Sequence, residues 1–213
     1  PEGLRTVRLV QLGAVSGAKV EAAFVGESEK VVLGTLNQSI SEFVLPEGKT
    51  LESITVSWGE VVPEIAELQT STAAVSAADK SELEAELAKP ADETWTTDSK
   101  TSFDNAKAIA QEVMDNPYTS QETVDSALGV LKAARANAKV KAANLDELQK
   151  LVDEALSNEN GVYSVYTFAA YEDAIRNLKK ALADSENLDV ATADTLKAAV
   201  ENAKAALEYS IRN

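Results

Sequence analysis

The side chains of this sequence that could do chemistry are carboxylates, lysine amines and a few aromatic rings. The chain has no histidine and no cysteine, so it lacks the usual general base, the thiol nucleophile and the usual transition-metal ligands. Hydrolysis of a glycosidic bond needs two carboxyl groups held about 5 to 10 Å apart across a cleft. The short strands and narrow helices predicted below offer no such cleft. We therefore expect no catalytic residue and no metal ligand set, and we expect that this chain itself is not an enzyme.

Acidic residues cluster in two places on predicted helices. The first cluster is Glu82, Glu84 and Glu86, and the second is Asp146 and Glu147 with Asp153 and Glu154. Both fall opposite the apolar stripes of their helices, which is typical of solvated helix faces. We interpret them as surface charge.

Loop carboxylates in the first third of the chain leave one cofactor question open. Glu27, Glu29, Glu47 and Glu60 lie in or near predicted turns, where they could bind Ca²⁺. No Asp-x-Asp-x-Asp loop is present. We expect no cofactor, and calcium is the alternative that stays open.

Three aromatic residues are candidates for stacking on a sugar ring: Trp58, Trp95 and Tyr163. Trp58 ends a predicted strand just before Gly59 and Glu60. Trp95 and Tyr163 stand in equivalent positions before predicted helices, where a hydrophobic staple would also place an aromatic ring. Carbohydrate binding and structural packing are both open interpretations for all three.

The charge and hydropathy of the chain exclude some partners. Asp and Glu outnumber Lys and Arg by 35 to 20, for a net charge of -15. The basic residues form no patch with interleaved aromatics. Nucleic acid and anionic membrane surfaces are therefore not expected partners. No apolar run is long enough for membrane insertion. Pro1 is not a natural translation start, so we expect covalently attached upstream domains. The absence of cysteine leaves the compartment open.

Residues 4 to 68 predict about six short antiparallel strands. Alternating β-branched runs are separated by turns such as Gly26-Glu27-Ser28-Glu29 and Pro46-Glu47-Gly48-Lys49. The predicted strands are 6–12, 19–25, 30–36, 40–45, 51–58 and 64–69. Six strands make a thin sandwich with exposed edges. We therefore expect the sandwich to be incomplete and to be completed by residues before Pro1 or by another chain.

The remainder of the chain is alanine-rich and repeats. Trp95-Thr96-x-x-Ser99-x-x-x-Phe103 returns 68 residues later as Tyr163-Ser164-x-x-Thr167-x-x-x-Tyr171. Each copy predicts three helices. In the first copy they are 79–88, 98–114 and a helix that begins at Thr119. In the second copy they are the continuation of that same helix, 167–182 and 192–211.

The stretch from Thr119 to Ser157 predicts one long helix. It has no proline and one glycine. It opens with Thr119-Ser120-Gln121-Glu122, which fits a capping box, and it would be about 60 Å long.

The predicted fold class is multidomain β + α: a small, incomplete antiparallel β-sandwich followed by two three-helix bundles that share this helix. The predicted domains are 1–70, 71–143 and 144–213, and a proline at Ala142 is expected to uncouple the two bundles.

Two resemblances to known families follow from these patterns. The aromatic-Thr/Ser-x-x-Ser/Thr repeat is similar to the FIVAR repeat, a three-helix module found in tandem in Gram-positive surface proteins and extracellular glycosidases. The strands Val20–Val25 and Val32–Leu36, with the segment Pro63–Leu68, resemble the C-terminal half of a discoidin-like galactose-binding sandwich, a module often attached to bacterial glycoside hydrolases.

These resemblances imply a function. They imply a non-catalytic C-terminal accessory or spacer region of a secreted or cell-wall-attached bacterial glycoside hydrolase, which contributes to domain presentation and to carbohydrate binding. The alternative is the stalk or host-ligand-binding repeats of a bacterial surface adhesin. The expected location is extracellular or cell-wall-associated, and the expected partners are upstream domains with glycans or a host surface protein. Self-association through an unpaired apolar stripe is a third hypothesis.

Overall fold

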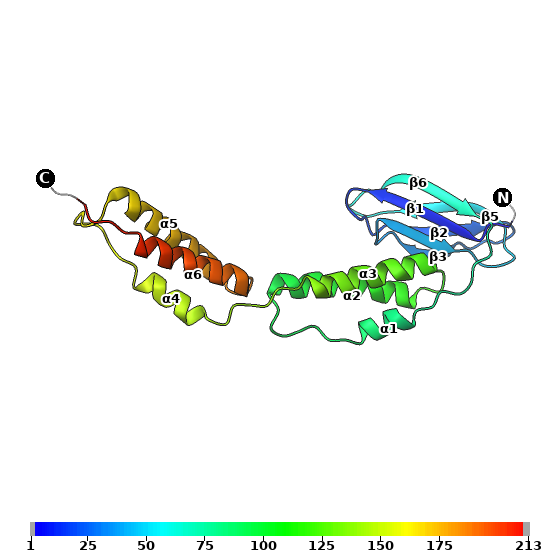
Figure 1. Cartoon of the computed structure of the whole chain (residues 1–213). Coiled ribbons are helices and arrows are strands. Elements are labelled where there is room, and N and C mark those ends of the chain that lie inside the picture. Colours follow the sequence, from blue (N-terminus) through cyan, green and yellow to red (C-terminus); the bar gives the residue numbers. More distant parts are fainter. Residues whose placement is uncertain (1–2, 211–213) are drawn as a thin grey trace. The chain divides into compact units, whose positions relative to one another are not determined.

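The computed structural model describes residues 3–210 of the chain. Pro1, Glu2 and the predicted helix end at Ile211 therefore lie outside the described residues. The chain divides into two compact units, Pro1–Pro90 with Phe103–Ala136 and Ala91–Ser102 with Asn137–Asn213. Figure 1 shows their elements.

The first unit contains two three-stranded antiparallel sheets. One has the order β4-β1-β6, with β1 at Thr6–Leu12, β4 at Ile40–Val44 and β6 at Glu64–Ser71. The other has the order β3-β2-β5, with β2 at Lys19–Phe24, β3 at Val31–Thr35 and β5 at Leu51–Ser57. The predicted strands are thus confirmed, with ends shifted by a few residues.

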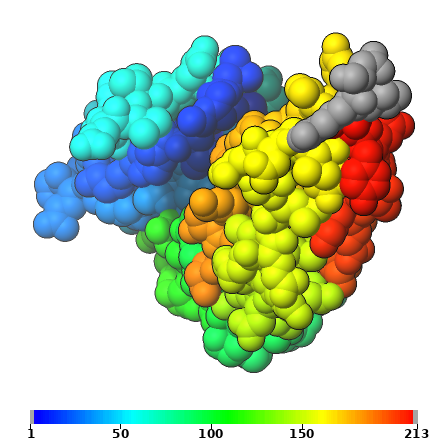
Figure 2. Space-filling model, turned by 90° about the vertical axis from the view of Figure 1, so that its left-hand side faces the viewer, coloured from blue at the N-terminus to red at the C-terminus, as the bar shows by residue number. Residues whose placement is uncertain are grey.

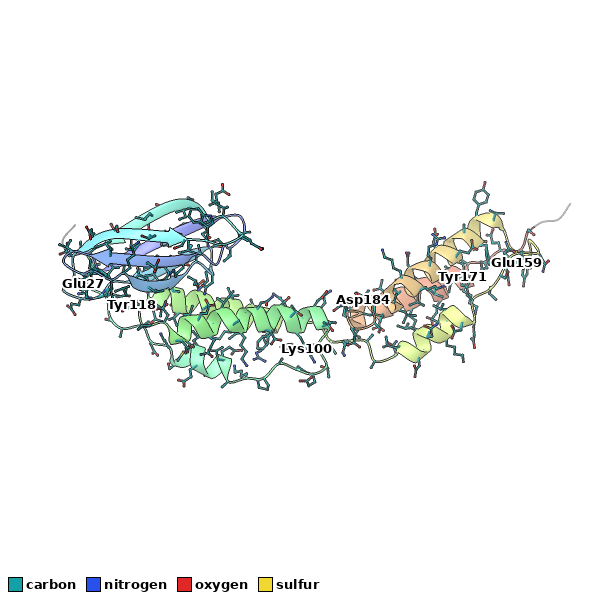
Figure 3. The ribbon with its side chains drawn as sticks, turned by 180° about the vertical axis from the view of Figure 1, so that it is seen from behind. Glu27, Lys100, Tyr118, Glu159, Tyr171 and Asp184 are labelled. Atoms are coloured by element: carbon teal, nitrogen blue, oxygen red, sulfur yellow. The ribbon has the colours of Figure 1, made fainter. Side chains whose placement is uncertain are left out.

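The core of these sheets follows from the alternation of apolar and polar side chains along the strands. Val7 and Leu9 of β1 and Val20, Ala22 and Phe24 of β2 are almost completely buried. Tyr118, labelled in Figure 3, packs against this core from the loop before α3 (Gln121–Ala136). The core therefore joins both sheets to the helical part of the same unit.

The strand β6 is an edge strand that is exposed on both faces. Ile65 is 38% exposed and Leu68 53% exposed, and the cyan surface in Figure 2 includes this strand. None of the described β6 residues belongs to the sheet core. The sheet core lies between β1, β4 and the second sheet.

The helices show that the predicted fold class is wrong. The described residues form six helices: α1 at Ser81–Leu87, α2 at Thr97–Asp115, α3, α4 at Leu145–Asp153, α5 at Val165–Leu182 and α6 at Val190–Ala205. No long helix joins two bundles, because α3 ends at Ala136 and α4 begins only at Leu145. The fold is a mixed β + α arrangement of two antiparallel sheets and separate helices. The division into domains 1–70, 71–143 and 144–213 stays a prediction.

Backbone pairing explains why the chain leaves the helix after Ala136. The segment 139–142 is extended and lies between two other segments of the second unit. Four backbone hydrogen bonds hold it: Thr96 N–H to Lys139 O at 2.8 Å, Lys141 N–H to Thr94 O at 2.8 Å, Ala142 N–H to Leu188 O at 2.8 Å and Val190 N–H to Val140 O at 3.1 Å. Helix propensity is a weak preference that such tertiary pairing overrides. A proline at Ala142 would thus remove a donor to Leu188 rather than interrupt a helix.

A close approach at Gly34 of β3 limits the side chains that the first unit tolerates. Gly34 has φ +147°, which favours glycine. A Cβ added there would lie 2.6 Å from Nδ2 of Asn116 and 2.7 Å from Cε1 of Phe43. Both contacts are shorter than any van der Waals distance, so the two side chains would have to move.

We predict that Gly34→Ala lowers the free energy of unfolding of the first unit by about 1 to 3 kcal/mol, because the added methyl group overpacks this contact. The measurement is urea unfolding followed by circular dichroism. The control is Gly129→Ala in α3, where the new Cβ meets nothing within 4 Å. This control should stabilise the protein by roughly 0.5 to 1 kcal/mol. Equal effects of the two substitutions would contradict the prediction.

Candidate functional site

Three of the helices, α2, α3 and α5, begin with the same set of hydrogen bonds, which we call the helix-start clamp. A clamp has a Ser or Thr at the residue before the helix and a second Ser or Thr three residues later. One residue of a neighbouring extended segment serves both. Its carbonyl accepts from the N–H of the first Ser or Thr, and its own N–H donates to the hydroxyl of the second. The first turn of the helix is thereby tied to one residue through both backbone groups of that residue.

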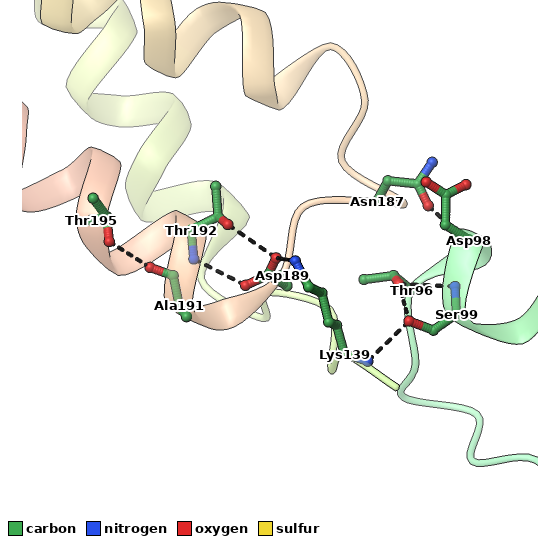
Figure 4. A network of polar contacts seen from close by, with 9 residues as sticks. All are labelled: Thr96, Asp98, Ser99, Lys139, Asn187, Asp189, Ala191, Thr192 and Thr195. Atoms are coloured by element: carbon green, nitrogen blue, oxygen red, sulfur yellow. Dashed lines mark hydrogen bonds and ion pairs between the residues drawn. The ribbon is translucent and has the colours of Figure 1, made fainter. Parts of the chain in front are cut away.

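The distances agree among the three clamps. In each pair of distances, the first joins the N of the first Ser or Thr to the partner's carbonyl O, and the second joins the partner's N to the hydroxyl O of the second Ser or Thr. The partner is Lys139 for Thr96 and Ser99 (2.8 and 2.9 Å), Glu42 for Ser120 and Thr123 (3.4 and 3.0 Å), and Glu208 for Ser164 and Thr167 (2.7 and 3.2 Å). The residue just before each clamp forms an isolated antiparallel bridge: Trp95 with Val140, Thr119 with Phe43, and Tyr163 with Tyr209. Figure 4 shows Thr96, Ser99 and Lys139 of the first clamp.

The clamps give the sequence repeat a physical meaning. The aromatic-Thr/Ser-x-x-Ser/Thr pattern at Trp95 and Tyr163 marks a bridge residue followed by the two clamping hydroxyls. The clamp of α3 has Thr119 where the others have an aromatic ring, so the aromatic pattern did not reveal it. The signal that could have found it is the spacing of Ser120 and Thr123.

The predicted capping box at Thr119 and Glu122 is wrong. Ser120 Oγ, and not Thr119, accepts from the N–H of Thr123 at 3.2 Å. Glu122 instead forms an ion pair with Arg8 of β1 at 2.8 Å. Strand β4 explains the difference, because its pairing places Thr119 in the bridge and leaves Ser120 at the start of the helix.

The structure places the three predicted sugar-stacking residues in different surroundings. Trp58 follows β5 and is 53% exposed, whereas Trp95 is buried at 7% exposure. Tyr163 is half-buried and stacks on Phe168 at 5.8 Å and on Tyr209 at 5.6 Å between ring centroids. Trp95 and Tyr163 therefore have packing positions next to clamps, while Trp58 presents its ring to solvent. A sugar-binding role for each stays a prediction.

One residue of the acidic clusters is buried, so the prediction of a fully solvated face was wrong for Glu86. Glu82 and Glu84 are exposed, but Glu86 is 3% exposed. Its carboxylate accepts from Lys89 Nζ at 2.5 Å and from Arg135 Nε of α3 at 2.7 Å. The hydrogen bond from Lys89 lowers the pKa of Glu86, with a further contribution from Arg135. Glu86 thus joins α1 to α3 as an ion-paired group of the interior.

Asp189 is a second buried carboxylate with a structural partner set. It caps α6, since Oδ1 accepts from the N–H of Thr192 at 3.0 Å, and Oδ2 pairs with Lys139 Nζ at 3.0 Å. Figure 4 shows both contacts. The backbone hydrogen bond from Thr192 lowers the pKa of Asp189, and the Lys139 contact lowers it further. The charged form of Asp189 is therefore part of the fold of the second unit.

The loop carboxylates considered for calcium are partly engaged by basic side chains. Glu27 pairs with Lys49 at 2.8 Å and Glu47 with Arg5 at 2.9 Å. Among residues 3–210, no group of three or more acidic, histidine or cysteine side chains is placed to hold a metal ion. Within the same range, no helix is long and apolar enough to cross a membrane.

The chain was compared with known proteins at the levels of family, sequence and structure. No family model matches it, and no curated protein matches it. A solved structure of the CBM51-2 and INT domains from Clostridium perfringens ZmpB is similar with a TM-score of 0.29 and 17% sequence identity. The match covers 73% of this chain and 39% of that one. A likeness at this TM-score carries no conclusion, so the resemblances to the FIVAR repeat and to the discoidin-like sandwich stay predictions.

We predict that acid weakens the second unit partly through Asp189. Its pKa lies below the ordinary 3.8 in the folded chain. A depressed carboxyl pKa gives stability that is present above the unfolded pKa and is lost as the pH falls through the folded pKa. The melting temperature should therefore decrease as the pH is lowered beyond about 4. Asp189→Asn should make this decrease shallower.

The measurement is the melting temperature by circular dichroism at several pH values between neutral and strongly acidic. Asp189→Ala is the matched variant, because it removes the cap as well as the charge. It should show the same shallower pH profile as Asp189→Asn and be less stable than that variant by about 1 kcal/mol at every pH. An unchanged pH profile in Asp189→Asn would contradict the assignment.

Proposed function

We propose that this chain is a non-catalytic accessory region of a secreted or cell-wall-attached bacterial protein, and that it holds neighbouring domains in a fixed orientation. A parent glycoside hydrolase fits the resemblances best. The observation that carries the proposal is the helix-start clamp of α3, which fastens helices to a free sheet edge. Fixed orientation needs elements that cannot move against each other, and this clamp supplies such a constraint within the first unit.

The α3 clamp covers the outer edge of β4, which has no strand neighbour on that side within the described part of the chain. Val44 N–H donates to Tyr118 O at 2.6 Å, and both backbone groups of Glu42 bond to Ser120 and Thr123. A sheet edge normally exposes a row of unpaired N–H and C=O groups. Here the edge is used as an attachment for α3.

The second sheet is fastened by the same loop. Asn116, just after α2, donates from Nδ2 to Leu33 O of β3 at 2.7 Å, while its Oδ1 accepts from Tyr118 N–H at 2.8 Å. Sliding of either sheet against the helices would leave partly buried polar groups unpaired, at up to about 1 to 3 kcal/mol each. Within the first unit, the sheets, α3 and the part of α2 from Phe103 onward therefore move as one body.

The chemistry of the side chains supports a role without catalysis. The sequence has no histidine or cysteine. The buried carboxylates Glu86 and Asp189 both have ion-pair partners that stabilise the charged form. A general acid needs the opposite, a carboxyl group whose pKa is raised towards neutrality.

We predict that the α3 clamp controls the rigidity of the first unit. Spin labels at the exposed positions Val25 and Val130 should give one narrow distance distribution by pulsed electron paramagnetic resonance. Thr123→Val should broaden it and lower the free energy of unfolding by about 1 to 3 kcal/mol, because Glu42 N–H loses its acceptor. Ser126→Ala, at an exposed hydroxyl on the same helix, is the control. A broad distribution in the unmodified chain would contradict a presenting role.

Glycan binding at Trp58 is the second function that we propose. An exposed tryptophan has an apolar face on which a sugar ring can stack, and Trp58 is the one of the three candidates that offers this face to solvent at 53% exposure.

We predict that the chain binds on a glycan array and that Trp58→Ala weakens this binding at least tenfold. The control is Trp95→Phe, which keeps a buried aromatic ring and should leave binding unchanged. Binding to host matrix proteins with no glycan bound would favour the adhesin alternative and would contradict this second function.

A further inference from the structure

A cavity of about 360 Å³ lies in the first unit between β3, β4, the end of α2 and the start of α3. Two hydroxyl groups line it, those of Ser41 and Thr119, which are 1% and 4% exposed. Both oxygens are buried and have no hydrogen-bond partner among the described residues. A buried polar group without a partner costs free energy, so two of them in one cavity point to a ligand that pairs with them.

The walls and the rim of the cavity define the chemistry of that ligand. Leu33, Phe43 and Val113 are buried apolar wall residues. The exposed carboxylates of Glu112 and Asp115 lie at the rim. Among residues 3–210, no lysine or arginine lines the cavity. An anion would therefore be repelled, and a purely apolar ligand would leave both hydroxyls unpaired.

The carboxylate of Glu112 is held in place at this rim. Its Oε2 accepts from Thr35 Oγ1 at 2.9 Å and from Asn37 Nδ2 at 2.6 Å. A carboxylate has about four acceptor positions, so Glu112 can accept from a ligand as well. The ligand favoured by this arrangement carries hydroxyl donors.

Comparison with the other two clamps indicates the size of the ligand. Thr119 is the bridge residue of its clamp, where the others have Trp95 and Tyr163. The cavity adjoins the residue that lacks a ring. The volume is near the lower end of the range of small-molecule sites, about 300 to 1,000 Å³. A ligand of one ring fits these limits better than a chain of rings.

We propose that this cavity binds one neutral sugar ring, such as the terminal residue of a glycan. Hydroxyl groups of the sugar pair with Ser41 and Thr119 at the floor and with Glu112 at the rim, and the apolar face of the ring packs against the wall at Phe43. The inference goes beyond the presenting role and depends on neither that role nor Trp58.

The test is a titration of the isotope-labelled full chain with glucose, galactose, mannose and N-acetylglucosamine, one at a time, followed by amide chemical shifts. Glucuronate is the anionic control. At least one neutral sugar should shift the amides of Ser41, Thr119 and Asn37, and glucuronate should not.

Two substitutions address the cavity directly. Ser41→Ala should raise the dissociation constant about fivefold, as expected for one hydrogen bond, without lowering the melting temperature, because the hydroxyl has no partner within the protein. Ser39→Ala, at an exposed hydroxyl two residues earlier, is its matched control. Thr119→Tyr should fill the cavity with the ring that the Tyr163 clamp carries. The sugar-induced shifts at the amides of Ser41 and Asn37 should then be lost while the fold is kept.

The proposal is overturned if no neutral sugar shifts these amides, or if the sugar shifts the amides of Ser41 and Asn37 in a folded Thr119→Tyr variant as it does in the unmodified chain. It is also overturned if a crystal soaked in the sugar shows only water between Ser41 and Thr119. Loss of sugar binding in Trp58→Ala, with binding kept in both Ser41→Ala and Thr119→Tyr, would overturn the cavity site and leave glycan binding at Trp58 in place.

Discussion

In both units, the helix-start clamp pairs the backbone of a helix start with the backbone of a neighbouring extended segment. The first turn of a helix has backbone N–H groups without partners inside the helix, and an extended segment at an edge has the same deficit along its side. In the clamp, one residue of the extended segment satisfies both deficits. Because Glu42, Lys139 and Glu208 each bond through carbonyl and N–H to one helix start, the direction in which the helix leaves the strand is fixed.

In the first unit the two edge strands of the sheet β4-β1-β6 differ, because β4 is bonded to a helix start and β6 is exposed. The edge of β4 is occupied by the start of α3, and Asn116 bonds to β3 of the other sheet. On the opposite side of its sheet, β6 has exposed residues on both faces. The buried polar contacts thus gather where sheets and helices meet, which is also where the cavity with Ser41 and Thr119 lies.

The three clamps differ in the size of the bridge residue, and that difference changes what lies beside each clamp. Trp95 is buried and Tyr163 stacks on two other rings, so these clamps are closed by aromatic packing. Thr119 has no ring, and a cavity adjoins it. One backbone arrangement therefore supports packing in two cases and a candidate binding site in the third.

Six strands, the approximate helices and the repeated aromatic-Thr/Ser-x-x-Ser/Thr pattern could be predicted from the residues alone, because alternation, periodicity and spacing are local properties. The residues alone did not predict the break between Ala136 and Leu145, the burial of Glu86 or the clamp at Ser120. Each of these depends on a partner far along the chain. The extended segment pairs with Thr94 and Leu188, Glu86 pairs with Arg135, and the clamp at Ser120 pairs with Glu42. These features could not be predicted from spacing, since a backbone group or a buried carboxylate pairs with the partner that folding brings close to it, and sequence spacing does not encode that partner.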